Sequence, residues 1–155
     1  MALQLGRLKI TRDIAVIGLC IIVLGVVLLQ PWRSRRGERQ ISLKHTNFSV
    51  RLASTPAEHA KGLSDTSRLK PHEGMLFTFQ PPEAACFWMK DMHYNLDILW
   101  FDAQRKLIYQ EWNASPDTYP ANFCPEKVAN YVLEIPGGTA RQLKLQLGDQ
   151  LQLRD

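Results

Sequence analysis

Residues 48–58, Phe-Ser-Val-Arg-Leu-Ala-Ser-Thr-Pro-Ala-Glu, carry the clearest structural signal in this chain of 155 residues. The first six alternate between more and less apolar side chains, which is the period of a strand with one buried face. Thr55 then predicts a helix N-cap, followed by a proline in the first turn and by Glu58, which completes a capping box. Gly62 predicts the end of that helix. The stretch therefore predicts a strand that leads directly into a short helix.

The segments that follow are predicted to be mostly strand, because they are rich in aromatic and β-branched residues. The strand candidates are Met75–Phe79, Cys86–Lys90, Ile98–Phe101, Leu107–Trp112 and Asn130–Ile135. Pro81-Pro82 is expected to break the chain between the first two of these strands.

The C-terminal part predicts a second short helix after Gly137-Gly138-Thr139, with Leu143 and Leu147 as its apolar contacts. A turn at Gly148-Asp149 is expected before a last strand, Gln150–Leu153. Many short strands with two short helices predict a mainly β domain over residues 41–155, built as a single β-sandwich or a barrel-like sheet.

An uncharged apolar run, Ile14–Leu29, precedes this domain. Sixteen helical residues cover roughly 24 Å, and residues 30–32 extend the run toward the ~30 Å of a bilayer core. The run has no polar face, as a core helix would need, and no small-residue site for cleavage as a signal peptide follows it. We therefore expect a basic cytoplasmic segment at 1–13, a transmembrane anchor at 14–32 and a solvated linker at 33–40.

The basic residues around the run do not decide its orientation. Three of them precede it and four follow it, namely Arg7, Lys9, Arg12, Arg33, Arg35, Arg36 and Arg39. The positive-inside rule therefore favours neither orientation. Since a single span near the start of a chain most often acts as a signal anchor, we expect a single-pass protein of the cell membrane with its domain outside the cytoplasm.

The net charge of +4 suggests nucleic-acid binding at first sight. From Gln40 to Asp155, however, twelve Lys and Arg residues stand against thirteen Asp and Glu residues. The excess positive charge flanks the apolar run, where it suits lipid headgroups. No basic stripe remains to follow a phosphate backbone, so the expected partner is the membrane and not a nucleic acid.

Six ordered motifs give the domain a resemblance to a known family. They are Thr55…Glu58…Gly62-Leu63, Gly74-Met75-Leu76-Phe77-x-Phe79, Phe87-Trp88-Met89-Lys90, Leu96-Asp97-Ile98 with Phe101-Asp102, Tyr131-Val132-Leu133-Glu134, and Gly148-Asp149. Over roughly residues 48–153 the chain resembles the prokaryotic family called domain of unknown function 192. The resemblance implies a compact β-sandwich, often behind a signal peptide or a single span, and it implies no activity. The chain departs from the family pattern at Ser64, at Asp91-Met92 and at Asn95.

The densest cluster of candidate functional residues is Phe87–Tyr94, with Asp97 close behind. On a strand, Trp88 and Lys90 would share one face, as a stacking platform beside a cation, with Asp97 nearby. Such a face suits an envelope glycan, peptide or protein. The structural alternative places Phe87 and Met89 in the core, Trp88 over a sheet edge and Lys90 in an ion pair.

A proline-rich loop, residues 114–125, is the second candidate feature. It carries the aromatic residues Tyr119 and Phe123, and long loops without regular structure are often functional. We expect it to form one wall of a cleft over Trp88 and Lys90, or else a simple crossover between strands. Glu134 is expected to be paired with Lys90 or a backbone amide.

Cys86 and Cys124 both lie in the domain, whereas Cys20 lies in the apolar run. Two cysteines in an exported domain favour one disulfide. The alternative is a nucleophilic thiol with His93 or His72 as its base. Scattered histidines and the lack of known metal or nucleotide motifs predict neither a metal centre nor a cofactor.

Three functions remain open from the sequence. The preferred one is a cell-envelope binding or accessory module that uses Trp88, Lys90, Asp97 and the 114–125 loop. The second is an envelope hydrolase or transferase that uses Asp97 or Glu134 with Lys90, or Cys124. The third is a structural role in assembly.

Overall fold

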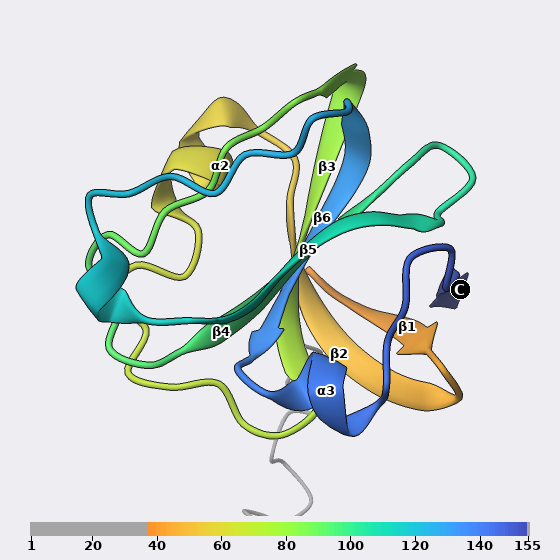
Figure 1. Cartoon of the computed structure of the whole chain (residues 1–155), viewed down its shortest axis with the longest axis horizontal. Helices are drawn as coiled ribbons and strands as arrows, with labels where there is room; N and C mark the ends of the chain where they lie inside the picture. Colours follow the sequence, from red (N-terminus) through yellow and green to blue (C-terminus); the bar gives the residue numbers. More distant parts are fainter. Residues whose placement is uncertain (1–36, 155) are drawn as a thin grey trace, which may run out of the picture. The chain divides into compact units, whose positions relative to one another are not determined.

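Alternating apolar residues produce one coiled sheet of seven strands in the computed structural model of the chain, which describes residues 37–154 (Figure 1). The strands are β1 (Glu38–Leu43), β2 (Thr46–Ala53), β3 (Glu73–Glu83), β4 (Leu96–Phe101), β5 (Leu107–Ala114), β6 (Ala129–Pro136) and β7 (Leu151–Arg154). Their order across the sheet is β5-β4-β6-β3-β2-β1-β7. Neighbouring strands are antiparallel except for β2 and β3, which are parallel.

The parallel pair explains the position of the first helix. A parallel connection needs a crossover, which usually contains a helix, and α2 (Pro56–Lys61) lies in the segment between β2 and β3. Its capping box is formed as the sequence predicts: Glu58 N donates to Thr55 Oγ1, and Thr55 N donates to Glu58 Oε2. Gly62 ends the helix at a φ of 47°, a conformation that favours glycine.

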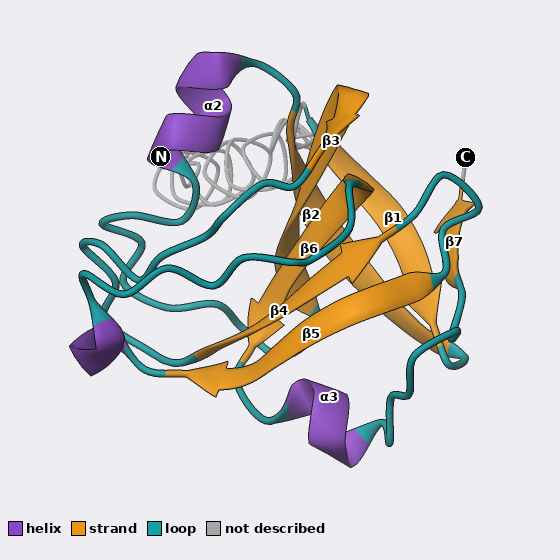
Figure 2. Cartoon of the chain, turned by 45° about the horizontal axis from the view of Figure 1, so that its top comes forward, coloured by secondary structure: helices purple, strands orange, loops and turns teal. Residues whose placement is uncertain are grey.

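The sheet curls until its two edge strands nearly meet (Figure 2). A bridge joins Lys106 to Gln150, and the amide of Leu107 donates to Asp149 O at 2.8 Å. All seven strands therefore belong to one half barrel, and the sandwich alternative of two packed sheets is wrong. The short helix α3 (Thr139–Gln142) lies after β6, and the 3-10 turn η1 (Pro116–Thr118) lies after β5.

Two apolar clusters lie on opposite faces of this sheet. The first fills the half barrel with alternate residues such as Phe48, Leu99 and Leu133. The second lies on the outer face around Phe77, Trp100 and other alternate residues. Since successive residues of a strand point to opposite faces, strands β2, β3, β4 and β6 contribute to both clusters.

Several sequence predictions of local structure need correction. Strand β1 begins at Glu38, inside the expected linker. Strand β3 continues through Pro81 and Pro82, with a register shift between Thr78 and Glu83 where it pairs with β6. In the last helical region the buried leucine is Leu145, whereas Leu147 is exposed.

The segment expected as a strand at Cys86–Lys90 is another correction. It makes only an isolated bridge, between Phe87 and Phe123. Met89 is buried and Phe87 packs against the outer cluster, whereas Trp88 is exposed. The alternation in the sequence is therefore real, but no neighbouring strand pairs with this segment.

The expected cytoplasmic segment, the anchor and most of the linker lie outside the described residues. Between residues 37 and 154, no helix has the length and apolar character needed to span a bilayer.

Candidate functional site

Glu134 lies in the middle of a row of residues that crosses the outer face of the sheet. The register pairs Arg51 of β2 with Met75 of β3, Met75 with Glu134 of β6, and Glu134 with Ile98 of β4. Both direct neighbours of Glu134 are thus apolar. The strand alternation places this carboxyl group on the same face as Val132 and the outer cluster.

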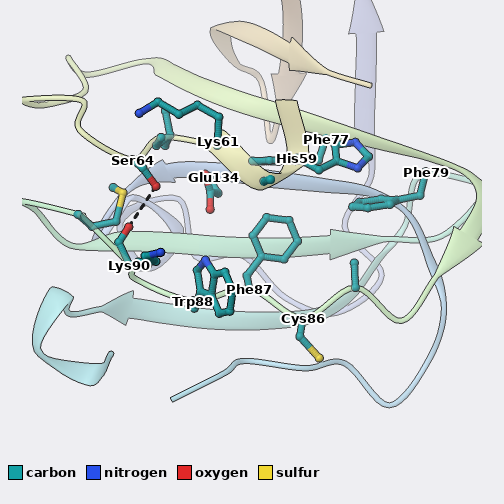
Figure 3. Close-up of a pocket in the computed structure, with 15 residues that line it drawn as sticks. His59, Lys61, Ser64, Phe77, Phe79, Cys86, Phe87, Trp88, Lys90 and Glu134 are labelled. Atoms are coloured by element: carbon teal, nitrogen blue, oxygen red, sulfur yellow. Dashed lines mark hydrogen bonds between the residues drawn. The ribbon is translucent and has the colours of Figure 1, made fainter. Parts of the chain in front are cut away.

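A cleft of about 220 Å³ opens at Glu134 (Figure 3). One wall is formed by α2 and the turn that follows it, with His59, Lys61 and Ser64. The opposite wall is the irregular segment 85–92, with Phe87, Trp88 and Lys90. The carboxyl group of Glu134 points into the space between the two walls.

The carboxyl group of Glu134 is buried without full hydrogen bonding. The residue is 5% exposed, and its Oε2 has no partner within the described part of the chain. Burial raises the pKa of Glu134 to about 8, although the positive charge of Arg51 acts in the opposite direction. At neutral pH the group is therefore mainly a neutral acid, which donates one hydrogen bond.

Tyr94 belongs to the same buried region. Its ring is partly buried, packed against the outer cluster, and Thr66 lies within hydrogen-bonding range of its hydroxyl group. Desolvation raises the pKa of Tyr94, and the charge of Glu134 raises it further. Buried polar groups normally find partners, so the unpaired oxygen of Glu134 is the exception in this region of the described chain.

Aromatic contacts hold the 85–92 segment in place. The ring of Phe87 packs edge-on against Phe77 at 4.8 Å between centroids and against Trp100 at 5.7 Å. The Trp100 indole donates from Nε1 to Ala85 O at 2.9 Å. Edge-to-face pairs of this kind add stability beyond the buried area, so this wall has a fixed position although it is not part of the sheet.

The 114–125 loop supports this wall from behind and does not line the cleft. Phe87 and Phe123 exchange two backbone hydrogen bonds, at 2.9 and 2.8 Å. Cys86 and Cys124 are joined by a disulfide between the same two segments. Tyr119 stands edge-on to Trp88 at 6.5 Å between ring centroids. The expected roles of Tyr119 and Phe123 as a cleft wall are therefore replaced by support of Trp88 and Phe87.

Trp88 and Lys90 both line the cleft, at its mouth. Trp88 is 51% exposed, and its neighbour Tyr119 is 47% exposed. Lys90 is exposed and forms no ion pair with any described residue, whereas Lys61 on the opposite wall binds Asp65 at 2.6 Å. The two walls are also tied together directly, because Ser64 Oγ donates to Lys90 O at 3.1 Å.

Asp97 is not part of this site. It is fully buried and accepts hydrogen bonds from the backbone amides of Asn113 at 2.8 Å, Gly138 at 3.0 Å and Ala140 at 2.6 Å. Its carboxylate therefore holds the start of α3 against the end of β5. The placement of Asp97 beside Trp88 and Lys90 was wrong, because Asp97 faces away from the outer cluster.

Sequence reasoning also missed two features of the cleft. His59 and Ser64 line it, but a short helix with its following turn gave no reason to expect them beside Trp88. Glu134 was expected to have a partner, and none of residues 37–154 supplies one to its Oε2. The available signal was a carboxylate inside the apolar run Tyr131-Val132-Leu133-Glu134-Ile135, since buried carboxylates are rare.

Solved structures and family profiles place this fold among known proteins. A protein of unknown function from Novosphingobium aromaticivorans DSM 12444 is 33% identical, with a TM-score of 0.70 over 74% of this chain and 84% of that one. A putative transcription regulator from Sinorhizobium meliloti 1021 is 28% identical, with a TM-score of 0.69 over 75% of this chain and 92% of that one. None of the curated proteins compared with the chain gives a significant match. The profile of domain of unknown function 192, described as Uncharacterized ACR, matches residues 39–153, and the chain belongs to this family.

Proposed function

We propose that the domain is a binding module that takes an envelope ligand into the Glu134 cleft. The observation that carries this proposal is a buried carboxyl group, Glu134, that lines a concave, partly aromatic site and whose Oε2 has no partner among the described residues. Ligand sites typically combine apolar walls with a few polar groups that fix the orientation of the ligand. Trp88 at the mouth and Glu134 at the floor supply these two elements.

Hydrolysis or group transfer is the second candidate function. A carboxyl group with a raised pKa in a cleft is typical of a general acid, and this observation favours Glu134 in that role. The other acid considered, Asp97, is occupied by three backbone amides. Cys124 is held in a disulfide, so it is not a nucleophile in the oxidised protein. Catalysis would need a second reactive group beside Glu134, and neither Asp97 nor Cys124 supplies it. Binding needs no such group, so we prefer binding.

The proposed location is the outer side of the cell membrane, with residues 14–32 as the anchor. An oxidising compartment suits the Cys86–Cys124 disulfide. Alkylation of intact cells with and without reductant tests this proposal. An exported domain gives cysteines that react with an impermeant reagent only after reduction, and free thiols that stay protected from it would place the domain in the cytosol instead.

The binding function is tested with the full-length protein in detergent against arrays of glycans and peptides. Trp88→Ala is expected to remove the detected interaction, because it removes the exposed ring at the mouth. Trp112→Ala is the matched control, since Trp112 is 43% exposed on β5 and does not line the cleft. Equal loss with both variants, or no loss with either, would show that the cleft is not the binding site.

A further inference from the structure

We propose that the ligand of this cleft is an acidic sugar, meaning a pyranose ring that carries a carboxylate. This inference rests on the proposed binding function and specifies its ligand. Three features of the cleft carry it, namely its charge, its size and the kind of surface that it exposes.

The charge of the cleft favours an anion. Lys61 and Lys90 stand at its mouth, and Asp65 neutralises Lys61 through an ion pair. Lys90 remains as a cation without an ion pair among the described residues. Because burial raises the pKa of Glu134 to about 8, this acid carries little negative charge at neutral pH to repel an anion. A cationic ligand would instead meet the ammonium group of Lys90 and find no charged counterion at the floor.

The size of the cleft favours one ring. Its volume of about 220 Å³ lies below the roughly 300–1,000 Å³ of typical small-molecule sites. This space suits a single sugar unit with its substituents, while further units of a chain would remain outside the mouth.

The exposed surface distinguishes a sugar from an apolar peptide side chain. Phe77 and Phe79 line the cleft, but they are only 1% and 4% exposed. The apolar surface open to a ligand is therefore mainly the ring of Trp88, with part of Phe87. A pyranose has one face of C–H groups, which stacks on such a ring, and hydroxyl groups elsewhere. Its hydroxyl groups can accept from the protonated Glu134 carboxyl group, and its carboxylate can accept from Lys90.

Calorimetric titration of the full-length protein in detergent with glucuronate and with glucose tests the proposal. We expect glucuronate to bind more tightly, and Lys90→Met to lower its affinity roughly tenfold, the effect of one charge-assisted hydrogen bond. Lys90→Met should leave glucose unaffected. Lys106→Met is the matched control, because Lys106 is an exposed lysine between β4 and β5 and does not line the cleft.

The pH dependence gives a second, independent readout. Glucuronate affinity is expected to fall between pH 7 and pH 9.5 in the natural protein, as Glu134 ionises and repels the anion. Glu134→Gln keeps a hydrogen-bond donor without a charge, so its affinity should stay constant over this range. The natural protein and the variant share the other charged and titratable groups around Glu134, namely Arg51, Tyr94, His59, Lys61 and Lys90. The difference between the two pH profiles therefore reports the ionisation of Glu134 alone.

The outcomes separate the ligand class from the binding function. Binding of peptides through Trp88 with no binding of glucuronate would overturn the acidic sugar and leave the binding module standing. Equal affinity for glucose and glucuronate would also overturn it. If neither sugars nor peptides respond to Trp88→Ala, both proposals are wrong.

Discussion

Glu134 shows how one buried carboxyl group makes the stability of the domain depend on pH. Its pKa is raised from 4.5 to about 8 in the folded protein. Between these two pH values the folded state therefore holds a proton that the unfolded state has released. Its contribution to stability is fully present below about pH 4.5. It is lost progressively as the pH rises from 4.5 through 8, at roughly 1.4 kcal/mol for each pH unit in that range. Glu134→Gln should therefore stabilise the protein at pH 8 but not at pH 4.5. Urea denaturation at both pH values measures this difference, and an equal effect at the two values would contradict it.

Asp97 is the second buried carboxylate, and its role is the opposite of that of Glu134. Its two oxygens accept three backbone amide protons, and hydrogen bonds to a charged group each contribute about 1.5–3 kcal/mol. Asp97→Asn turns one acceptor into a donor that faces an N–H group, so we expect a loss of about 3 kcal/mol in the free energy of unfolding. Ligand affinity at the cleft should not change, because Asp97 lies outside it. A selective loss of binding with unchanged stability would return Asp97 to the functional site.

At the scale of elements, the contact between β3 and β6 forms the floor of the cleft. Gly74 lets the two strands approach, since a Cβ atom there would lie 2.6 Å from Glu134 O and 3.1 Å from Ile135 Cγ2. Gly74→Ala must push backbone atoms apart, so we expect a destabilisation of about 1–3 kcal/mol together with weaker ligand binding. Thr78→Ala, a half-buried position of the same strand, is the control and should cost less. Thermal unfolding and titration of both variants check this, and a neutral Gly74→Ala would mean that the strands can separate freely.

At the scale of the whole molecule, the Cys86–Cys124 disulfide joins two irregular segments that are 38 residues apart in sequence. Closing a loop of this length stabilises a protein by ~3–4 kcal/mol in the chain-entropy description. The double variant Cys86→Ser/Cys124→Ser should lose about this amount. Reductant should destabilise the natural protein to a similar extent and leave the double variant unchanged. Urea denaturation with and without reductant measures both effects, and an insensitive natural protein would show that the thiols are free in solution.

The same disulfide links stability to the proposed function. It holds the 85–92 wall against the loop that carries Tyr119, and the Tyr119 ring stands against Trp88. The cleft thus depends on contacts between segments that are distant in the chain, which explains why sequence reasoning considered Trp88 and Lys90 together but misplaced their neighbours.

The sequence alone determined features that arise from local interactions. The alternation in residues 48–53 predicted β2, and the spacing of Thr55 and Glu58 predicted the capped helix, because both signals lie within a few neighbouring residues. The family and the mainly β class also followed from ordered motifs along the chain. Strand β1 escaped notice because its burial depends on pairing with β2 on one side and β7 on the other.

Only the tertiary structure decided which acid lines the cleft. Asp97 and Glu134 both follow apolar residues in strands, and nothing local distinguishes them. The register of β6 between β3 and β4 places Glu134 opposite Met75 and Ile98, where no donor from the described part of the chain reaches its Oε2. Asp97 instead meets two amides at the start of α3 and one at the end of β5. A buried carboxyl group gains hydrogen bonds only if backbone N–H groups lie close to it in space. The number of residues between the carboxyl group and those N–H groups along the chain does not determine whether they come close.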